Sequence, residues 1–226
     1  EVIDPMITRY LNDLASLFFP DTCAGCDTPL VYGERLICTS CWYQLPVTLS
    51  ADKLHMLGTG PSASLFLLTE PSRIQRIIHR MKYRNRPEIG ILLGERFGSI
   101  LADTPPYAES EVVVPVPLHP LKLRQRGYNQ SACFAQGLAT AMGKPVAIHG
   151  LARLRATESQ TTKNRYERYT NMESAFRLNE PAAIIGKHVL LVDDVLTTGA
   201  TLEACAAVLL EGGATKVSAA TIAKTL

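Results

Sequence analysis

The stretch 189–201 (Val-Leu-Leu-Val-Asp-Asp-Val-Leu-Thr-Thr-Gly-Ala-Thr) constrains the fold more than any other part of the chain. Its first four residues are apolar, which is typical of a buried central strand in a parallel sheet. Residues 202–210 then follow a helical pattern, and the glycines at 212 and 213 are expected to end that helix. A strand, a short turn and a helix in this order indicate an α/β fold.

The turn between that strand and that helix is suited to an anion. Free backbone N–H groups and the positive end of the helix dipole converge at Thr197, Thr198 and Gly199, so a phosphate is the expected occupant. Asp193 and Asp194 would repel a phosphate beside them, so we expect them to face sugar hydroxyls or a hydrated cation. The alternative is a Rossmann-like strand end whose acids cap the helix, although a cap needs only one acid.

This stretch resembles the phosphoribosyl-pyrophosphate (PRPP) signature of type I phosphoribosyltransferases. In that signature an apolar strand, two acids and two apolar residues precede Thr-Thr-Gly-x-Thr, and all thirteen positions fit. The resemblance implies that Asp193 and Asp194 hold the ribose 2′- and 3′-hydroxyls. The remaining PRPP-binding residues would be Val195, Leu196, Thr197, Thr198, Gly199, Ala200 and Thr201, of which the last five would wrap the 5′-phosphate. The assignment requires carboxylates free of internal salt bridges and a turn open to an anion.

Two Cys-x-x-Cys pairs near the N-terminus form the second strong pattern. They are Cys23, Cys26, Cys38 and Cys41. This spacing lets four thiolates converge tetrahedrally on one zinc ion, and a module this small needs metal to fold. We expect structural zinc in a zinc ribbon with a short hairpin at 29–37, rather than disulfides or a redox dithiol. Trp42 and Tyr43 follow the last ligand, where they either pack on the protein or stack on nucleic-acid bases.

A basic segment in the middle of the chain indicates an anionic partner. From His119 to Arg168 the sequence contains nine lysines and arginines but only two glutamates. The segment begins after a predicted strand at 111–117, at the edge where open α/β sheets bind ligands. We expect a cationic loop for pyrophosphate there, with a solvated basic turn as the alternative. The candidate residues are Pro117, Leu118, His119, Lys122, Arg124 and Arg126.

The polar segment between Arg153 and Phe176 is expected to form a mobile loop or a partly helical lid that excludes water from the site. Its arginines and tyrosines would also suit single-stranded nucleic acid, and a solvated helix face explains them as well. The candidate residues for the lid or for nucleic acid are Gln160, Arg165, Arg168 and Asn171.

The rest of the chain predicts two parts. Residues 1–57 would hold an amphipathic helix at 5–19 and the cysteine module, and residues 61–226 would form the main domain after a linker at 58–62. Helices are expected at 73–83, 87–102 and 131–142, and further strands at 63–68, 145–151 and 217–223. The predicted fold class is therefore α/β, a Rossmann-like parallel sheet flanked by helices, with a small N-terminal zinc ribbon. The signature implies the type I phosphoribosyltransferase version of it.

The composition, 46% hydrophobic and 19% charged, is that of a globular protein. No apolar run approaches the roughly 20 residues that a membrane span needs. The N-terminal residues also lack the layout of a signal peptide. We therefore expect a cytoplasmic protein without membrane insertion.

Further motifs narrow the resemblance to the ComF/GntX family. They are Val114-Pro-Val-Pro-Leu-His119, Arg126-Gly-Tyr-Asn-Gln130, Thr157-x-x-Gln160 and Arg168-x-x-Asn171. The family couples a four-Cys zinc module to a phosphoribosyltransferase-like domain, and the likeness runs from Cys23 nearly to the C-terminus. It implies transfer of phosphoribosyl from PRPP to a nucleotide or nucleic-acid related acceptor, with Asp193 and Asp194 as catalytic residues, and a role in DNA uptake and natural transformation.

The resemblance also implies a set of cofactors and partners. These are structural zinc, Mg²⁺ with PRPP, PRPP or a related sugar phosphate, single-stranded DNA, and a competence helicase or other DNA-uptake proteins.

Enzymes that salvage 6-oxopurines usually carry an acid three residues after the second acid of the signature, and Thr197 stands there instead. Purine salvage is therefore disfavoured. The alternatives to an enzyme are a PRPP or nucleotide sensor and a single-stranded-DNA adaptor.

Overall fold

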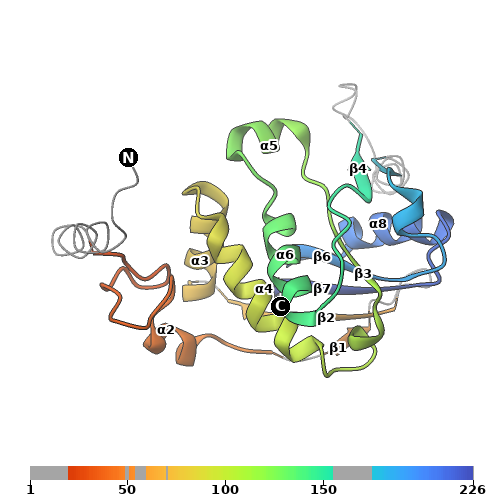
Figure 1. The fold of residues 1–226 in the computed structure, drawn as a ribbon. Helices are drawn as coiled ribbons and strands as arrows, with labels where there is room; N and C mark the ends of the chain where they lie inside the picture. The colour runs from red at the N-terminus through yellow and green to blue at the C-terminus, as the bar shows by residue number, and fades with distance from the viewer. Residues whose placement is uncertain (1–19, 49–50, 54–59, 70, 155–174, 226) are drawn as a thin grey trace, which may run out of the picture.

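A five-stranded sheet forms the centre of the structure (Figure 1), a computed structural model that describes residues 20–48, 51–53, 60–69, 71–154 and 175–225. In spatial order the strands are β1 (Ala51–Lys53), β2 (Pro61–Leu68), β7 (Lys216–Thr225), β6 (His188–Leu196) and β3 (Val112–Pro115). β1 is antiparallel to β2, and the other neighbouring pairs are parallel. This topology confirms the predicted α/β class.

Helices cover both faces of the sheet (Figure 1). One face carries α3 (Arg73–Tyr83), α4 (Pro87–Leu101) and α6 (Gln130–Met142), and the other carries α8 (Ala200–Glu211) with a small antiparallel sheet of β4 (Leu151–Arg153) and β5 (Phe176–Leu178). Leu190 and Val192 belong to the first core, whereas Val189 and Leu191 belong to the second. Both layers exclude water from β6, which explains its uninterrupted apolar run.

The strand register brings two chemically distinctive segments to one edge of the sheet. Pro115 at the end of β3 lies opposite Val192, and Asp193 lies opposite Thr221 of β7. The chain therefore leaves β3 level with Asp193 and Asp194, which lie in the last part of β6. This is the carboxyl edge at which open parallel sheets bind ligands.

The chain after β3 differs from the predicted cationic loop. Residues Pro120–Arg126 form a short helix, α5, which contains no buried residue and arches away from the sheet (Figure 1). The helix forms because Pro120 occupies its first turn and because His119 Nδ1 accepts a hydrogen bond from the Leu121 backbone N–H at 3.3 Å. Gly127 then ends it.

The strand expected at 145–151 is wrong. Val146 makes only an isolated parallel bridge with Val113, and the strand in this region is β4, which begins at Leu151. The Gly150 backbone N–H donates to the Ala147 carbonyl at 3.0 Å, so the chain turns away from the sheet after one bridge.

The hairpin expected at 29–37 is also wrong. Within residues 20–48 there are isolated bridges, Thr22 with Pro29 and Arg35 with Ile37, and a helix, α2 (Thr39–Gln44). The cysteine module is therefore a pair of tight turns and a helix rather than a ribbon of paired strands. Its apolar residues, including Ile37 and Leu45, join the core that contains α3 and α4.

The other predicted elements match closely. The expected helices at 73–83, 87–102 and 131–142 are α3, α4 and α6, and the expected strands at 63–68 and 217–223 lie within β2 and β7. β1 pairs with β2 although it precedes the expected domain boundary at 57. The helix expected at 5–19 lies outside the described residues. Among the described helices, none has the length and apolar character needed to cross a membrane.

Candidate functional site

Asp193 is held at the carboxyl edge of the sheet by two hydrogen bonds. Its Oδ1 accepts from Ser131 Oγ at 2.8 Å and from the Asp194 backbone N–H at 2.8 Å. Ser131 lies in the first turn of α6, where the side chain of Asn129 caps the helix. The N-terminus of α6 thus fixes the orientation of the first signature carboxylate.

The ionisation of Asp193 is poised near neutrality. Burial, followed by the adjacent Asp194 carboxylate, raises the pKa of Asp193 to about 7, against the opposing effects of Ser131, the Asp194 N–H and Lys82. Two neighbouring carboxylates resist simultaneous ionisation in a shielded site. A ligand that donates hydroxyl hydrogens to Asp193 would therefore favour loss of its proton.

Asp194 differs from the expectation of a carboxylate without an internal ion pair. Its Oδ2 lies 3.0 Å from Nζ of Lys82 in α3, and the two side chains are only 16% and 20% exposed. Because both partners are shielded, the pair is stronger than an exposed surface ion pair. A diol ligand at Asp194 must therefore share this carboxylate with Lys82 or displace the lysine.

The turn after β6 is open. Thr197 and Thr198 are exposed, and Gly199 has φ +82°, a backbone conformation that favours glycine. Gly199 is also the N-cap of α8, and a glycine has no side chain with which to cap the helix. The first N–H groups of α8 are therefore not used by their N-cap residue, and such groups can bind an anion.

The candidate pyrophosphate residues differ in their exposure and in what they contact. Lys122 and Arg124 are exposed on α5. Arg126 instead donates to Gln130 Oε1 at 2.8 Å and to the Tyr83 hydroxyl at 3.3 Å, and its guanidinium lies 5.0 Å from the centre of the Tyr83 ring. Arg126 therefore joins α3 to α6. Pro117 and Leu118 are half-buried, and His119 caps α5.

The lid candidates Gln160, Arg165, Arg168 and Asn171 lie outside the described residues. The described residues on either side, Leu151–Arg153 and Phe176–Leu178, pair as β4 and β5. The two ends of the intervening segment are thus held next to each other by a short antiparallel ladder.

The four cysteines of the N-terminal module converge as the spacing predicts. The Sγ atoms of Cys23, Cys26, Cys38 and Cys41 all lie within 4.8 Å of one another. Sγ of Cys26 and Sγ of Cys38 are 3.7 Å apart. Two thiolates about 2.3 Å from a tetrahedral zinc ion would be about 3.8 Å apart. The cluster therefore has the dimensions of a closed tetrathiolate zinc site.

Backbone groups support the same cluster. The Gly25 and Cys38 N–H groups donate to Cys23 Sγ at 3.3 and 3.2 Å, and the Cys41 N–H donates to Cys38 Sγ at 3.4 Å. Hydrogen bonds to Thr28 lower the pKa of Cys26 to about 6, whereas burial raises the pKa of Cys38 and of Cys41. A bound cation would offset the cost of ionising the buried thiols.

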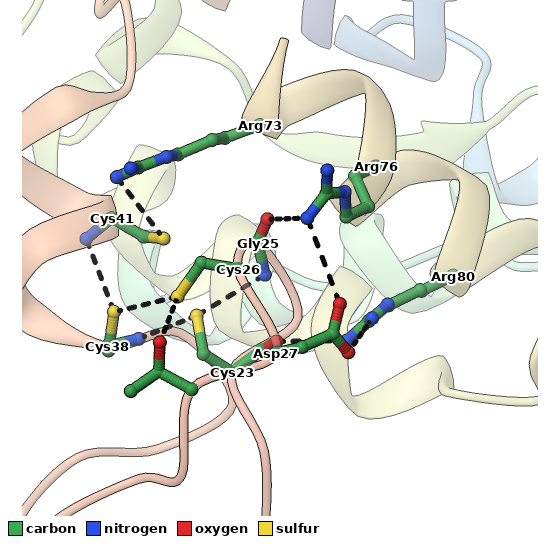
Figure 2. A network of polar contacts seen from close by, with 10 residues as sticks. Cys23, Gly25, Cys26, Asp27, Cys38, Cys41, Arg73, Arg76 and Arg80 are labelled. Atoms are coloured by element: carbon green, nitrogen blue, oxygen red, sulfur yellow. Dashed lines mark hydrogen bonds and ion pairs between the residues drawn. The ribbon is translucent and has the colours of Figure 1, made fainter.

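Three arginines of α3 dock this module on the main domain, as Figure 2 shows. Arg73 Nη1 donates to Cys41 Sγ at 3.7 Å, Arg76 Nη1 donates to the Gly25 carbonyl at 3.1 Å, and Arg80 Nη1 donates to the Cys23 carbonyl at 2.9 Å. Arg80 and Arg76 also form ion pairs with Asp27. Positive charge next to the four sulfurs would stabilise an anionic tetrathiolate zinc complex.

The two aromatic residues after the last cysteine differ in their exposure. Trp42 packs against the core that contains α3, so its ring serves the fold. Tyr43 is 87% exposed.

The sequence interpretation missed several residues of both sites. Lys82 and Ser131 reach the signature acids from segments 62 or more positions away, and no motif marks either of them. The arginines of α3 carried a usable signal, because positions 73, 76 and 80 share one helix face. What that face contacts could not be read from the spacing.

Comparison with known proteins first shows the class of protein to which the main domain belongs. The sequence model of a family described as "Phosphoribosyl transferase domain" matches residues 129–225, which include Ser131, both acids and the following turn. The type I phosphoribosyltransferase fold, a parallel sheet flanked by helices, is therefore confirmed together with a small four-cysteine module.

Similar sequences from bacteria then show the family to which this chain belongs. The chain is 34% identical to "DNA utilization protein YhgH" of Salmonella typhi over 93% of this chain and 100% of the relative. It is 34% identical to "Competence protein ComFC" of Bacillus subtilis over 91% and 86%, and 30% identical to "Competence protein F" of Haemophilus influenzae over 80% and 74%. The chain belongs to the ComF family.

Proposed function

We propose that this chain binds PRPP at the turn between β6 and α8 and transfers its phosphoribosyl group to a nucleotide or nucleic-acid related acceptor. The observation that carries the proposal is the junction itself: two adjacent carboxylates in the last part of β6, followed by the N-terminus of α8, whose N-cap residue is a glycine. A carboxylate pair suits a diol, and free N–H groups suit a phosphate. A ribose 5-phosphate unit presents both groups.

Each part of the junction has a separate task in this proposal. Asp193 and Asp194 would accept hydrogen bonds from the ribose hydroxyls, and the residues from Thr197 to Thr201 would hold the 5′-phosphate. Fixing both ends of the sugar restricts the position of C1, where the reaction takes place. The transfer breaks the bond between C1 and the pyrophosphate oxygen while a nucleophile of the acceptor bonds to C1.

The two metals of the proposal have different tasks. Carboxylates and pyrophosphate oxygens are hard ligands that fit Mg²⁺, which would neutralise charge on the departing pyrophosphate. The cysteine cluster fits zinc, and a set of four thiolates leaves no open position for a substrate. We therefore assign zinc a structural task in docking the N-terminal module on α3.

The names of the relatives support a role in the use or uptake of DNA. A second candidate function, a single-stranded-DNA adaptor, is favoured by α5, which buries no residue and exposes Lys122 and Arg124 at the same edge of the sheet. Exposed cations of this kind bind phosphates with a strong dependence on salt. A non-catalytic PRPP sensor would use the same junction without turnover.

Calorimetric titration with PRPP and Mg²⁺ tests the binding step. The double variant Asp193→Asn/Asp194→Asn should lose at least about 100-fold in affinity, because it removes two charge-assisted contacts. The exposed Asp103→Asn serves as the matched control and should bind like the parent protein. Equal affinity of the double variant and the parent would refute the site.

Release of pyrophosphate from PRPP, measured across a set of nucleobase, nucleotide and oligonucleotide acceptors, separates the enzyme from the sensor. Acceptor-dependent release supports transfer, whereas tight binding without release with any acceptor supports the sensor.

A further inference from the structure

We propose that Lys82 sets the ligand specificity of this site. Its ammonium group moves away from Asp194 and contacts the pyrophosphate group of PRPP, and it returns to Asp194 when that group is absent. The inference rests on the proposed function, since it requires a ribose phosphate at the signature acids. It adds a residue that lies outside the signature and outside the matched domain, which begins at residue 129.

The backbone on either side of Lys82 is fixed, so its side chain starts from a defined place. Met81 is fully buried, and its carbonyl accepts a hydrogen bond from the Tyr128 hydroxyl. Tyr83 contacts the Arg126 guanidinium with its ring and its hydroxyl. Arg126 in turn donates to Gln130 in α6, the helix that also supplies Ser131. The end of α3 is thus attached to the elements that hold Asp193.

The charge balance gives Lys82 two alternative partners. Without ligand, its ammonium neutralises Asp194 at 3.0 Å. When ribose hydroxyls donate to the carboxylates, they compete with Lys82 for the oxygens of Asp194. A flexible lysine side chain can then turn to a nearby anion without moving α3.

The pyrophosphate of PRPP is such an anion. It is attached to C1, next to the carbon that bears the 2′-hydroxyl, so a lysine beside the diol-binding acids lies within a few ångströms of the leaving group. Ribose 5-phosphate has the same diol and the same 5′-phosphate but lacks this group. Lys82 would therefore stabilise bound PRPP and compete with bound ribose 5-phosphate.

The test compares the affinities of PRPP and ribose 5-phosphate for the parent protein and for Lys82→Met, both with Mg²⁺ present. Methionine keeps most of the length and the apolar stem of lysine but removes the charge. The variant should bind PRPP about 10-fold or more weakly and ribose 5-phosphate equally well or more tightly. The preference for PRPP should therefore fall by at least about 10-fold.

Two controls isolate the charge of Lys82. Lys216→Met removes a lysine that pairs with Glu109 at 3.3 Å at the opposite end of β7, and it should leave both affinities unchanged. Lys82→Gln keeps a hydrogen-bond donor without the charge. It provides the same comparison if Lys82→Met does not fold, as judged by circular dichroism.

The outcomes separate this inference from the proposed function. If the parent protein binds PRPP but the Lys82 variants change the two affinities by the same factor, Lys82 only balances Asp194 and the inference is wrong. If the parent protein binds neither sugar phosphate, the proposed function fails and the inference fails with it. A selective loss of PRPP affinity supports both.

Discussion

Replacing Ser131 with alanine should weaken sugar-phosphate binding in a way that depends on pH. Ser131 Oγ donates to Asp193 Oδ1 at 2.8 Å, and this hydrogen bond favours the ionised carboxylate. Only the ionised form can accept hydrogen bonds with both oxygens from ribose hydroxyls. Burial and the neighbouring Asp194 carboxylate raise the pKa of Asp193, and the Ser131 hydroxyl lowers it. Without that hydroxyl, the pKa of Asp193 should therefore rise above about 7.

The size of the effect follows from the strength of such a bond. A hydrogen bond to a charged group contributes about 1.5–3 kcal/mol, which equals a pKa change of about one to two pH units. At pH 7 the ionised fraction would fall from about one half to between about one tenth and one hundredth, so affinity should fall about 5- to 50-fold. At pH 9 Asp193 is almost fully ionised in the parent protein and at least about half ionised in the variant, so the difference should shrink to about twofold or less.

Calorimetric titration with ribose 5-phosphate at pH 7 and pH 9 measures both values. The ligand phosphate, with a second pKa near 6, is dianionic at either pH, so the change reports on the protein. Thr140→Ala removes an exposed hydroxyl from the same helix and should not change either affinity. An equal loss for Ser131→Ala at both pH values, or no loss at pH 7, would contradict the reasoning.

Two further predictions concern the cysteine module and α5. Gly25→Ala would place a methyl carbon 2.8 Å from Cys41 Sγ, so zinc affinity in chelator competition should fall about 10- to 100-fold. The control Ser40→Ala, between two of the cysteines, should not change the zinc affinity. Parent-like zinc affinity in Gly25→Ala would show that the sulfurs do not hold the metal in this geometry. Lys122→Ala/Arg124→Ala should weaken single-stranded oligonucleotide binding and reduce the slope of log affinity against log salt by about 1.4, roughly 0.7 for each cation; an unchanged slope would exclude α5 from the contact.

The sequence predicted those parts of the site whose chemistry is local. A strand, two acids, a threonine-rich turn and a helix are contiguous, so their arrangement follows from one segment, as do the two cysteine turns. Contacts between side chains that are far apart in the sequence were not predictable in this way. Lys82 reaches Asp194, and Ser131 reaches Asp193, only because α3 and α6 pack on the same face of the sheet.

The errors in secondary structure also have local physical causes. Residues 145–151 have the composition of a strand, but a turn closed at Gly150 removes them from the sheet after one bridge. The segment after Pro117 is predicted to be a loop because it is basic and follows the carboxyl end of a strand. The capping His119 and Pro120 nevertheless start a helix without any buried side chain, so an amphipathic pattern could not reveal it.

A crystal structure of the chain with PRPP and Mg²⁺ would show directly whether the junction between β6 and α8 binds a sugar phosphate. We expect the ribose hydroxyls to lie within about 3.2 Å of Asp193 and Asp194. We also expect the 5′-phosphate to contact the backbone N–H groups between Thr197 and Thr201, and Lys82 to have turned from Asp194 to the pyrophosphate. A sugar phosphate bound elsewhere, with Lys82 still paired to Asp194 and the turn in contact with solvent alone, would contradict the proposed binding site.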